Sequence, residues 1–341
     1  MSSNTSITDA GTTSVPQQKE GVRPRKKLKG WMIGSIIGIV ILLGAAIAYF
    51  LLQTQVTPLS LPKIPANVTA SQLGLDQWQV YQQPLPAHPL DDPSLPATPQ
   101  VDASKALLQD AAGQALIQKG DLTRGLAYMK AAVQADPANL RYSNDYRVEL
   151  RNHQRYQEEL AFFSSLSKQN AATNVTIEHA LSYVDMMRSC PKPPDGLVCQ
   201  AQDSYNSISI LDKVLQDNPY NIIARYARGL NHLYWPTLMG HLPKSQTDLQ
   251  YAVALSQAQS KISPAFTAQG YVALGDVFGK SGNPKEARNV WLNGLNATHD
   301  QTLLKQRLAI PQDQIRSQED NQLRGLGVYV DTDITIFWRK G

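Results

Sequence analysis

The chain of 341 residues contains two cysteines, Cys190 and Cys199, whose spacing suggests a specific chemistry. The eight residues between them include three prolines and a glycine, so the intervening loop can close. A disulfide that closes about ten residues stabilises a fold by about 2.7 kcal/mol in the chain-entropy model. We expect a structural disulfide, with a free or redox-active pair and a metal site as the alternatives. The spacing is neither C-x-x-C nor the C-x-x-C-H haem motif.

Six histidines are the other candidates for a reactive or metal-binding site: His88, His153, His179, His232, His241 and His299. No two are four residues apart, and no H-E-x-x-H motif occurs. His232 and His241 flank an insert around Trp235 and could meet there, although such pairs are more often solvated or hydrogen-bonded. A nucleophile elbow, a phosphate-binding glycine loop and a dinucleotide fingerprint are also missing. We therefore expect no cofactor, no metal and no enzyme activity.

The formal charge of +4 is concentrated at the N-terminus. Residues 1–30 carry six basic and two acidic side chains, and residues 31–52 carry none. The remainder holds 26 of each sign. A nucleic-acid-binding domain normally spreads its basic residues over a folded face, so we expect no nucleic-acid partner. Residues 1–30 are predicted to be a disordered, basic cytosolic tail.

Residues 31–52 form an uncharged, strongly apolar run. As a helix they would extend about 33 Å, enough to cross a bilayer core of about 30 Å. A buried core helix and a cleaved signal peptide are the alternatives, but a signal peptide has a shorter apolar region. Because the basic cluster precedes the run, we predict a single-pass signal anchor in the cell membrane with its N-terminus cytosolic and its C-terminal domain outside the cytosol. Gly34 and Gly38 have the spacing of a helix-dimer face, which would allow a homodimer.

The residues after the predicted span fall into two regions of different composition. Residues 53–101 hold nine of the 21 prolines, a density that excludes helix and favours an extended stalk. From Asp102 onward, N-cap and turn signals recur, with a capping box predicted at Ser245 and a strong helix start at Asn283–Pro284. The spacing predicts helices of roughly 12–16 residues, packed as hairpins over 102–310. The fold class is all-α.

Two segments, 268–301 and 106–139, resemble the tetratricopeptide repeat (TPR), a helix-turn-helix of 34 residues. In the first, the residues at the family's large and small positions are Tyr271, Leu274, Gly275, Phe278, Ala287 and Trp291. Weaker repeats are expected at 140–173, 188–221 and 222–258. In 140–173, Arg147 and Glu159 replace the small residues, and 222–258 carries the Trp235–Pro243 insert. The resemblance implies a TPR-like α-solenoid, and a generic α-solenoid is the alternative.

The resemblance also implies a partner groove, because the first helix of each TPR hairpin lines the concave face. Carried onto this sequence, the groove contains Asp110, Gln114, Arg141, Asp145, Arg151, Tyr226, Tyr234, Trp235, Asp276 and Lys280. For Tyr226 and Trp235, packing between repeats is the more common role. The Lys/Asn clamp for acidic C-terminal peptides is not evident. We expect a protein or peptide partner.

The C-terminal extension, 311–341, departs from the helical pattern. Its residues 327–338 are rich in β-branched and aromatic types, which predicts a short strand that forms a hairpin, packs on the last helices or joins a partner's sheet. Together these features favour a membrane-anchored extracytoplasmic scaffold that binds a protein partner and supports a membrane or envelope complex. The alternatives are a membrane-tethered envelope-modifying enzyme and a structural subunit of a surface assembly.

Overall fold

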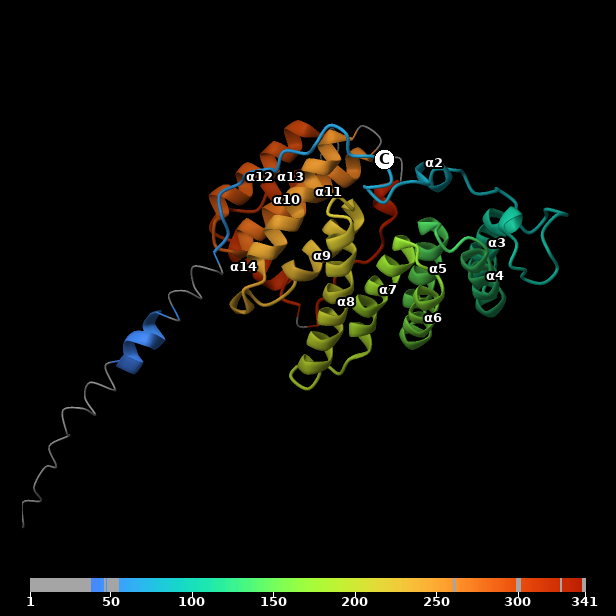
Figure 1. Ribbon diagram of the computed structural model, residues 1–341, viewed down its shortest axis with the longest axis horizontal. Helices are drawn as coiled ribbons and strands as arrows, with labels where there is room; N and C mark the ends of the chain where they lie inside the picture. The colour runs from blue at the N-terminus through green and yellow to red at the C-terminus, as the bar shows by residue number, and fades with distance from the viewer. Residues whose placement is uncertain are drawn as a thin grey trace, which may run out of the picture. The chain divides into compact units, whose positions relative to one another are not determined.

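The computed structural model describes residues 38–45, 47, 55–259, 262–298, 302–325 and 327–338 (Figure 1). The chain divides into two compact units, residues 1–50 and residues 51–341. In the first unit, residues 38–45 are helical. The predicted tail 1–30 and most of the predicted span 31–52 lie outside the described residues. Among the described helices, none is both long enough and apolar enough to cross a membrane.

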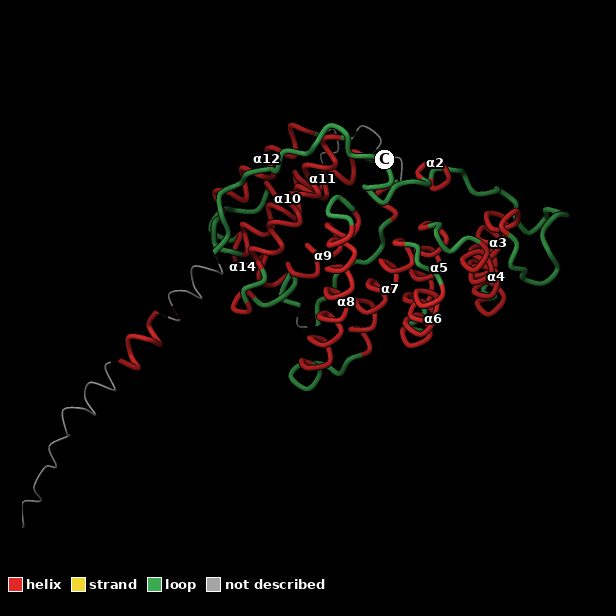
Figure 2. The backbone as a smooth tube through the Cα atoms, viewed as in Figure 1, coloured by secondary structure: helices red, strands yellow, loops and turns green. Residues whose placement is uncertain are grey.

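The second unit is helical, as the sequence predicts, and its described residues contain no strand (Figure 2). The α-helices are α2 (Trp78–Tyr81), α3 (Ala106–Gln118), α4 (Leu122–Ala135), α5 (Leu140–Asn152), α6 (Tyr156–Gln169), α7 (Thr173–Met186), α8 (Leu197–Asp217), α9 (Ile222–Leu233), α10 (Leu242–Ala258), α11 (Pro264–Lys280), α12 (Pro284–Ala297), α13 (Thr302–Leu308) and α14 (Ile315–Gln322). The 3-10 helices are η1 (Ala103–Lys105), η2 (Met187–Ser189), η3 (Thr237–Met239) and η4 (Thr335–Phe337).

The strand expected within 327–338 is wrong. Residues 328–334 have no regular secondary structure, and η4 follows them. A lone strand is not stable without a neighbour to pair with its backbone. Here the neighbours of the segment are helices, and helical side chains supply the hydrogen-bond partners.

Successive α-helices from α3 to α12 pair as hairpins (Figure 1). The two predicted repeats, 106–139 and 268–301, coincide with α3–α4 and α11–α12. Glycines allow the close helix contact: a Cβ at Gly113 would lie 2.7 Å from the carbonyl oxygen of Gly125, and one at Gly275 would lie 2.1 Å from Trp291 Nε1. The packing that the TPR resemblance implies is therefore present in these two hairpins.

Of the predicted capping signals, the one at Asn283 is confirmed and the one at Ser245 is wrong. The Asp121 carboxylate accepts a hydrogen bond from the Arg124 N–H, and Asn283 accepts one from the Glu286 N–H ahead of α12. The capping box predicted at Ser245 is wrong, because α10 already begins at Leu242. Ser245 lies buried inside the helix, and its hydroxyl donates to the Gly229 carbonyl at 2.8 Å.

The repeat frame predicted at 188–221 is out of phase with the structure. The hairpin in this region is α7–α8, so its first helix precedes the predicted frame. The connector between the two helices holds the predicted disulfide, with the Cα atoms of Cys190 and Cys199 5.8 Å apart. A disulfide loop of this kind is an insertion into a repeat hairpin, which explains why a fixed 34-residue period misplaces the helices.

The expectation that the proline density excludes helix is wrong, because the short helix α2 lies within the segment. The other described residues of the segment are turns and irregular backbone, and much of the segment packs on the helices and does not project as a free spacer. Val68, Leu73, Leu75 and Tyr81 are buried in the main hydrophobic core. The Leu73 carbonyl accepts a hydrogen bond from the Ile222 N–H at the start of α9, at 3.2 Å. The described residues from 55 onward are therefore part of the second unit.

Two glycines of α11 provide a matched test of this helix packing. Gly275→Ala would place a Cβ against the fully buried Trp291, and overpacking of this kind costs about 2 kcal/mol. Gly270→Ala meets only Val253, at 3.2 Å, and gains helix propensity, so its effect should stay below about 1 kcal/mol. Urea unfolding of both variants measures the difference, and equal stabilities would contradict the packing of α11 on α12.

Candidate functional site

The inner helices of the hairpins surround the C-terminal segment, residues 327–338. Helices α5, α7, α9 and α11 all contribute side chains that contact it. In Figure 1 the segment is red and ends near α2, in agreement with a contact between the rings of Trp338 and Tyr81, whose centroids are 5.2 Å apart. We call the face of these helices that holds the segment the groove; the predicted groove residues in contact with the segment include Arg151 and Tyr226.

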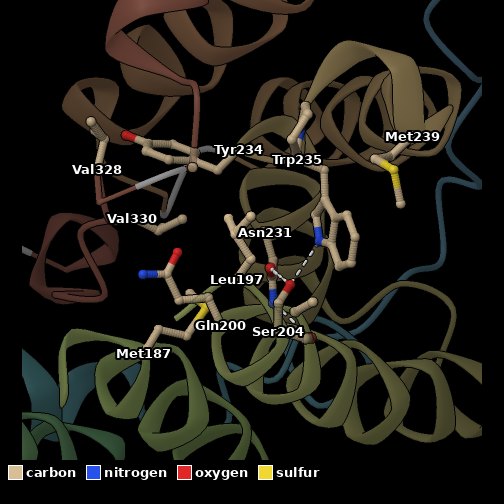
Figure 3. Close-up of a pocket in the computed structure, with 13 residues that line it drawn as sticks. Met187, Leu197, Gln200, Ser204, Asn231, Tyr234, Trp235, Met239, Val328 and Val330 are labelled. Carbon is tan, nitrogen blue, oxygen red and sulfur yellow. Dashed lines mark hydrogen bonds between the residues drawn. The ribbon is translucent and has the colours of Figure 1, made fainter. Parts of the chain in front are cut away.

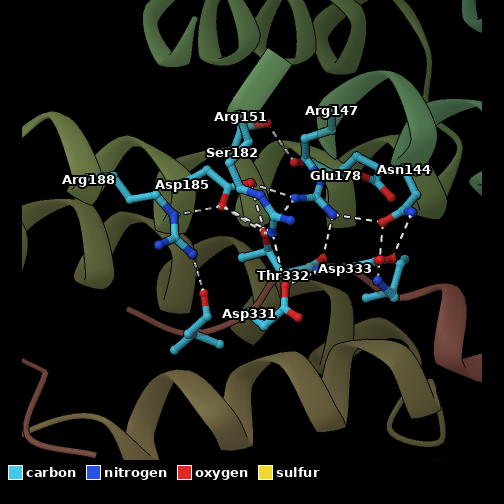
Figure 4. Close-up of polar contacts among 12 residues, drawn as sticks. Asn144, Arg147, Arg151, Glu178, Ser182, Asp185, Arg188, Asp331, Thr332 and Asp333 are labelled. Carbon is cyan, nitrogen blue, oxygen red and sulfur yellow. Dashed lines mark hydrogen bonds and ion pairs between the residues drawn. The ribbon is translucent and has the colours of Figure 1, made fainter. Parts of the chain in front are cut away.

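A fully buried arginine of α5, Arg147, anchors the middle of this segment (Figure 4). Its guanidinium donates through Nε to Glu178, through Nη1 to Asp185 at 2.6 Å and through Nη2 to Asn144 at 2.9 Å. The two remaining donations go to Thr332, one to its hydroxyl at 2.8 Å and one to its carbonyl. All five N–H groups of a guanidinium are thereby satisfied.

Thr332 contacts three side chains at once. Its hydroxyl accepts hydrogen bonds from Arg147 and from Arg151, the latter at 2.8 Å, and donates to the Asp185 carboxylate at 2.7 Å. A hydroxyl with one proton and two lone pairs has no further capacity, so Thr332 is completely satisfied. A residue without this hydroxyl would take one hydrogen bond each from Arg147, Arg151 and Asp185, although Arg147 and Asp185 would keep their ion pair. Losing a hydrogen bond to a buried charged group is costly.

Residues on either side of Thr332 are held in the same way. Arg151 Nη1 forms an ion pair with Asp331 at 3.0 Å, and Asn144 Nδ2 donates to Asp333 Oδ1 at 3.1 Å. Arg188 Nη2 of η2 donates to the Val330 carbonyl at 2.7 Å. The segment is therefore held mainly by side chains of the helical unit, in contrast to the backbone ladder of a sheet.

The end of the segment is held by aromatic packing. Phe337 is fully buried, its ring stacks on Phe266 with the centroids 4.0 Å apart, and it meets Tyr226 edge-on at 5.8 Å. Trp338 is also buried and packs on Tyr81. Tyr226 thus serves the packing role that was the alternative to ligand binding.

Four of the predicted groove residues form a polar cluster at the N-terminal end of the repeats. Gln114 Nε2 donates to Asp110 and to Asp145, each at 3.1 Å. Burial raises the pKa of Asp110 well above its usual range and that of Asp145 to about 6. Arg141 donates to the carbonyls of Tyr81 and Gln83, so it fastens the proline-rich segment to α5.

Three other predicted groove residues, Tyr234, Asp276 and Lys280, lie at the other end of the repeats. Asp276 receives two hydrogen bonds from Arg307, each 2.9 Å long, and together with Tyr234 these residues line a cavity of about 430 Å³. Lys280 is buried and donates to three carbonyls, those of Leu233, Trp235 and Leu323. The polar groups of Asp276 and Lys280 therefore form hydrogen bonds with groups of the same chain.

Trp235 lines an apolar cavity of about 350 Å³ between α8, α9 and the C-terminal segment (Figure 3). Its indole Nε1 donates to Ser204 Oγ at 2.7 Å, and the ring stacks on His241. Among the residues that the structure describes, none forms a hydrogen bond with the amide oxygen Oε1 of the buried Gln200 side chain. The lining residues are Met187, Leu197, Gln200, Ala201, Ser204, Asn231, Tyr234, Trp235, Pro236, Met239, Gly325, Val328 and Val330.

The expected meeting of His232 and His241 is confirmed, with their Nδ1 atoms 2.8 Å apart. Burial lowers the pKa of His232 to about 3 and that of His241 to about 4, so both rings are neutral at pH 7. Within the described residues, the metal-ligating side chains that cluster are Cys190, Cys199 and Asp203, and the two cysteines are already joined in the disulfide.

Sequence reasoning missed Glu178, Asp185 and Thr332 as partners of the groove. A usable signal was Arg147, an arginine at a repeat position that favours a small residue. A cation at such a position must find buried anions, and α7 supplies two of them.

No protein-family model matches the sequence, and no curated protein does. Among solved structures, the fold is similar to that of a thermophilic TPR protein from Thermus thermophilus. The two chains are 18% identical, the match covers 60% of this chain and 97% of the Thermus chain, and the TM-score is 0.45.

Glu159 of α6, fully buried near Arg147 and Asp185, provides a pH test of this region. Burial and the Asp185 carboxylate raise its pKa from 4.5 to about 10. The folded chain keeps a proton that the unfolded chain releases, so stability falls as the pH rises between these values, by as much as about 1.4 kcal/mol per pH unit. Glu159→Gln, which never ionises, should therefore gain stability over the wild type from pH 5 to pH 9.

Unfolding free energies measured in urea at several pH values test this expectation. Glu158→Gln is the matched control, since its side chain is partly exposed and pairs with Arg155 at the surface. The control should follow the wild-type profile. A constant difference between Glu159→Gln and the wild type across this pH range would contradict a protonated Glu159.

Proposed function

We propose that this chain is a membrane-anchored scaffold outside the cytosol that binds an extended segment of a protein partner and supports a membrane or envelope complex. The observation that carries the binding role is the seating of residues 330–338 against α5, α7, α9 and α11. Their side chains satisfy the Thr332 hydroxyl and enclose the Phe337 ring. A surface that holds one extended segment so completely has the chemistry to hold another.

The anchor and the topology rest on the sequence. Residues 31–52 carry no charged side chain, and a basic cluster precedes them. The disulfide between Cys190 and Cys199 is consistent with an oxidising compartment, since disulfides persist there and are rare in the cytosol. These two features support the proposal independently of each other.

An exposed apolar surface beside the 350 Å³ cavity supports a role in protein binding. Leu197 and Val198 begin α8, and Leu238 and Met239 belong to η3. Their exposed fractions are 39%, 81%, 87% and 55%. Leu197 and Met239 also line the cavity. Exposed apolar side chains grouped around a pocket are typical of contact sites for other proteins.

The proposed role is binding and not catalysis. The buried polar residues at the predicted groove positions donate to or accept from groups of the same chain, which supports a structural use for them. Strand addition to a surface assembly has less support, because residues 331–338 already contact their own helices.

Affinity purification of the full chain from its host membrane tests the proposal. The wild type should retain a specific partner. A double variant that introduces charge, Val198→Asp with Leu238→Asp, should reduce recovery of the partner at least tenfold. Leu292→Asp, a change at a 43% exposed leucine of α12, is the control and should retain the partner. Recovery of no partner would contradict a scaffold that binds through this surface. Equal recovery with the wild type, the charged variant and the control would also contradict it.

The state of the cysteines in intact cells tests the topology. Free thiols are alkylated before lysis, and the peptides that contain Cys190 and Cys199 are identified by mass spectrometry. We expect the disulfide-linked form, because the proposed location is oxidising. Complete alkylation of both thiols would place the domain on the reducing side of the membrane.

A further inference from the structure

We propose that residues 330–338 are a resident ligand of the groove, and that a partner protein displaces them with a segment of the same chemistry. The pattern is Asp-Thr-Asp, three intervening residues and two aromatic residues, as in Asp331 to Trp338. This inference rests on the proposed binding role and specifies the class of partner.

Recognition in the polar half of the groove depends on side chains of the ligand. Arg151 contacts the Asp331 carboxylate, Asn144 contacts that of Asp333, and the Thr332 hydroxyl sits among two arginines and one aspartate (Figure 4). A segment with apolar residues at these positions would remove the Asp331 carboxylate and the Thr332 hydroxyl from Arg151. It would also remove that hydroxyl from Arg147, which would keep its pairs with Glu178 and Asp185. The groove therefore selects an acidic segment with a central hydroxyl.

The aromatic half gives the ligand a fixed register. The Phe337 ring is enclosed by Phe266 and Tyr226, and the Trp338 ring packs on Tyr81. Buried aromatic rings are common anchors in interfaces. Because the polar and aromatic contacts are separated by a fixed number of residues, both halves must match for a segment to bind well.

The segment can leave without unfolding a helix of the repeats. It follows α14 through Gly325 and Gly327, whose φ values of +70° and +77° lie in the left-handed region. Beyond these glycines its contacts are mainly side-chain hydrogen bonds, ion pairs and ring packing. The short η4 is its sole helical element within the described residues.

A competitor must overcome the advantage of a ligand on the same chain. A tethered segment has an effective concentration of about millimolar or higher, so an identical segment from a second copy competes poorly. The 350 Å³ cavity offers a partner an additional contact, since Val328 and Val330 form part of its wall (Figure 3). Gln200 Oε1, which has no partner within the described part of the chain, would accept a hydrogen bond from a side chain placed there. These features favour a partner protein over a second copy.

A labelled peptide of residues 327–341 is the probe, and its fluorescence anisotropy with the purified full chain reports occupancy of the groove. The wild type should bind it weakly. The full chain with Thr332→Val and Phe337→Ala, which weaken the resident segment, should bind it at least tenfold more tightly. A peptide carrying the same two changes should bind neither chain.

Two further variants identify the groove and guard against a folding defect. The Asp331 side chain is 78% exposed, so Asp331→Asn weakens the resident segment with little risk to the fold and should raise peptide affinity about threefold. In the doubly substituted chain, Arg151→Gln should lower affinity about tenfold. Arg155→Gln, the matched control, pairs with Glu158 away from the groove and should not change it.

The proposal is overturned if the folded variants bind the peptide no better than the wild type does. It is also overturned if two differently tagged wild-type copies co-purify as a dimer through their C-terminal segments, since the natural competitor would then be a second copy. If the folded variants bind the peptide no better than the wild type does, the partner could still be recovered through the apolar surface around Leu238. Failure of this inference is thus distinguishable from failure of the proposed function.

Discussion

The buried guanidinium of Arg147 is the interaction on which the arrangement of the repeats depends. A charge removed from water is tolerated when it is paired and fully hydrogen-bonded. Arg147 meets that condition by drawing on α5, α7 and the C-terminal segment at once. The groove side chains are therefore fully satisfied only when this segment, or another of the same chemistry, is in place. The C-terminal segment is thereby part of the folded structure, although it has no strand or long helix of its own among the described residues.

The same principle ties the proline-rich segment to the repeats. Arg141, about 1.7 turns before Arg147 on α5, donates to the carbonyls of Tyr81 and Gln83. The Tyr81 ring of α2 packs on Trp338. The proline-rich and C-terminal segments thus meet beside α5. A repeat fold made of successive hairpins would otherwise have contacts mainly between neighbours in the chain. Here two long-range segments join hairpins that are not adjacent.

Prediction from the sequence succeeded where a local rule applies and failed where the outcome depends on distant neighbours. Asn283 was identified at a helix start because an N-cap bonds to residues two or three positions away. Ser245 follows the same rule in the sequence, yet it lies inside α10, where the Gly229 carbonyl accepts its hydroxyl proton. The groove was expected, but its occupant was not, because nothing local in residues 327–338 identifies the helices that bind them.

The sequence by itself determined the all-helical class, the position of two well-formed hairpins and the pairing of Cys190 with Cys199. Helix periodicity, caps and a short closable loop are properties of neighbouring residues, so one chain is enough to reveal them. Only the tertiary structure decided that the C-terminal segment fills the groove and that Arg147 holds it there. That choice depends on buried charges finding partners as far apart as residues 147 and 332, and the hydrogen bonds that satisfy them exist only in the folded chain.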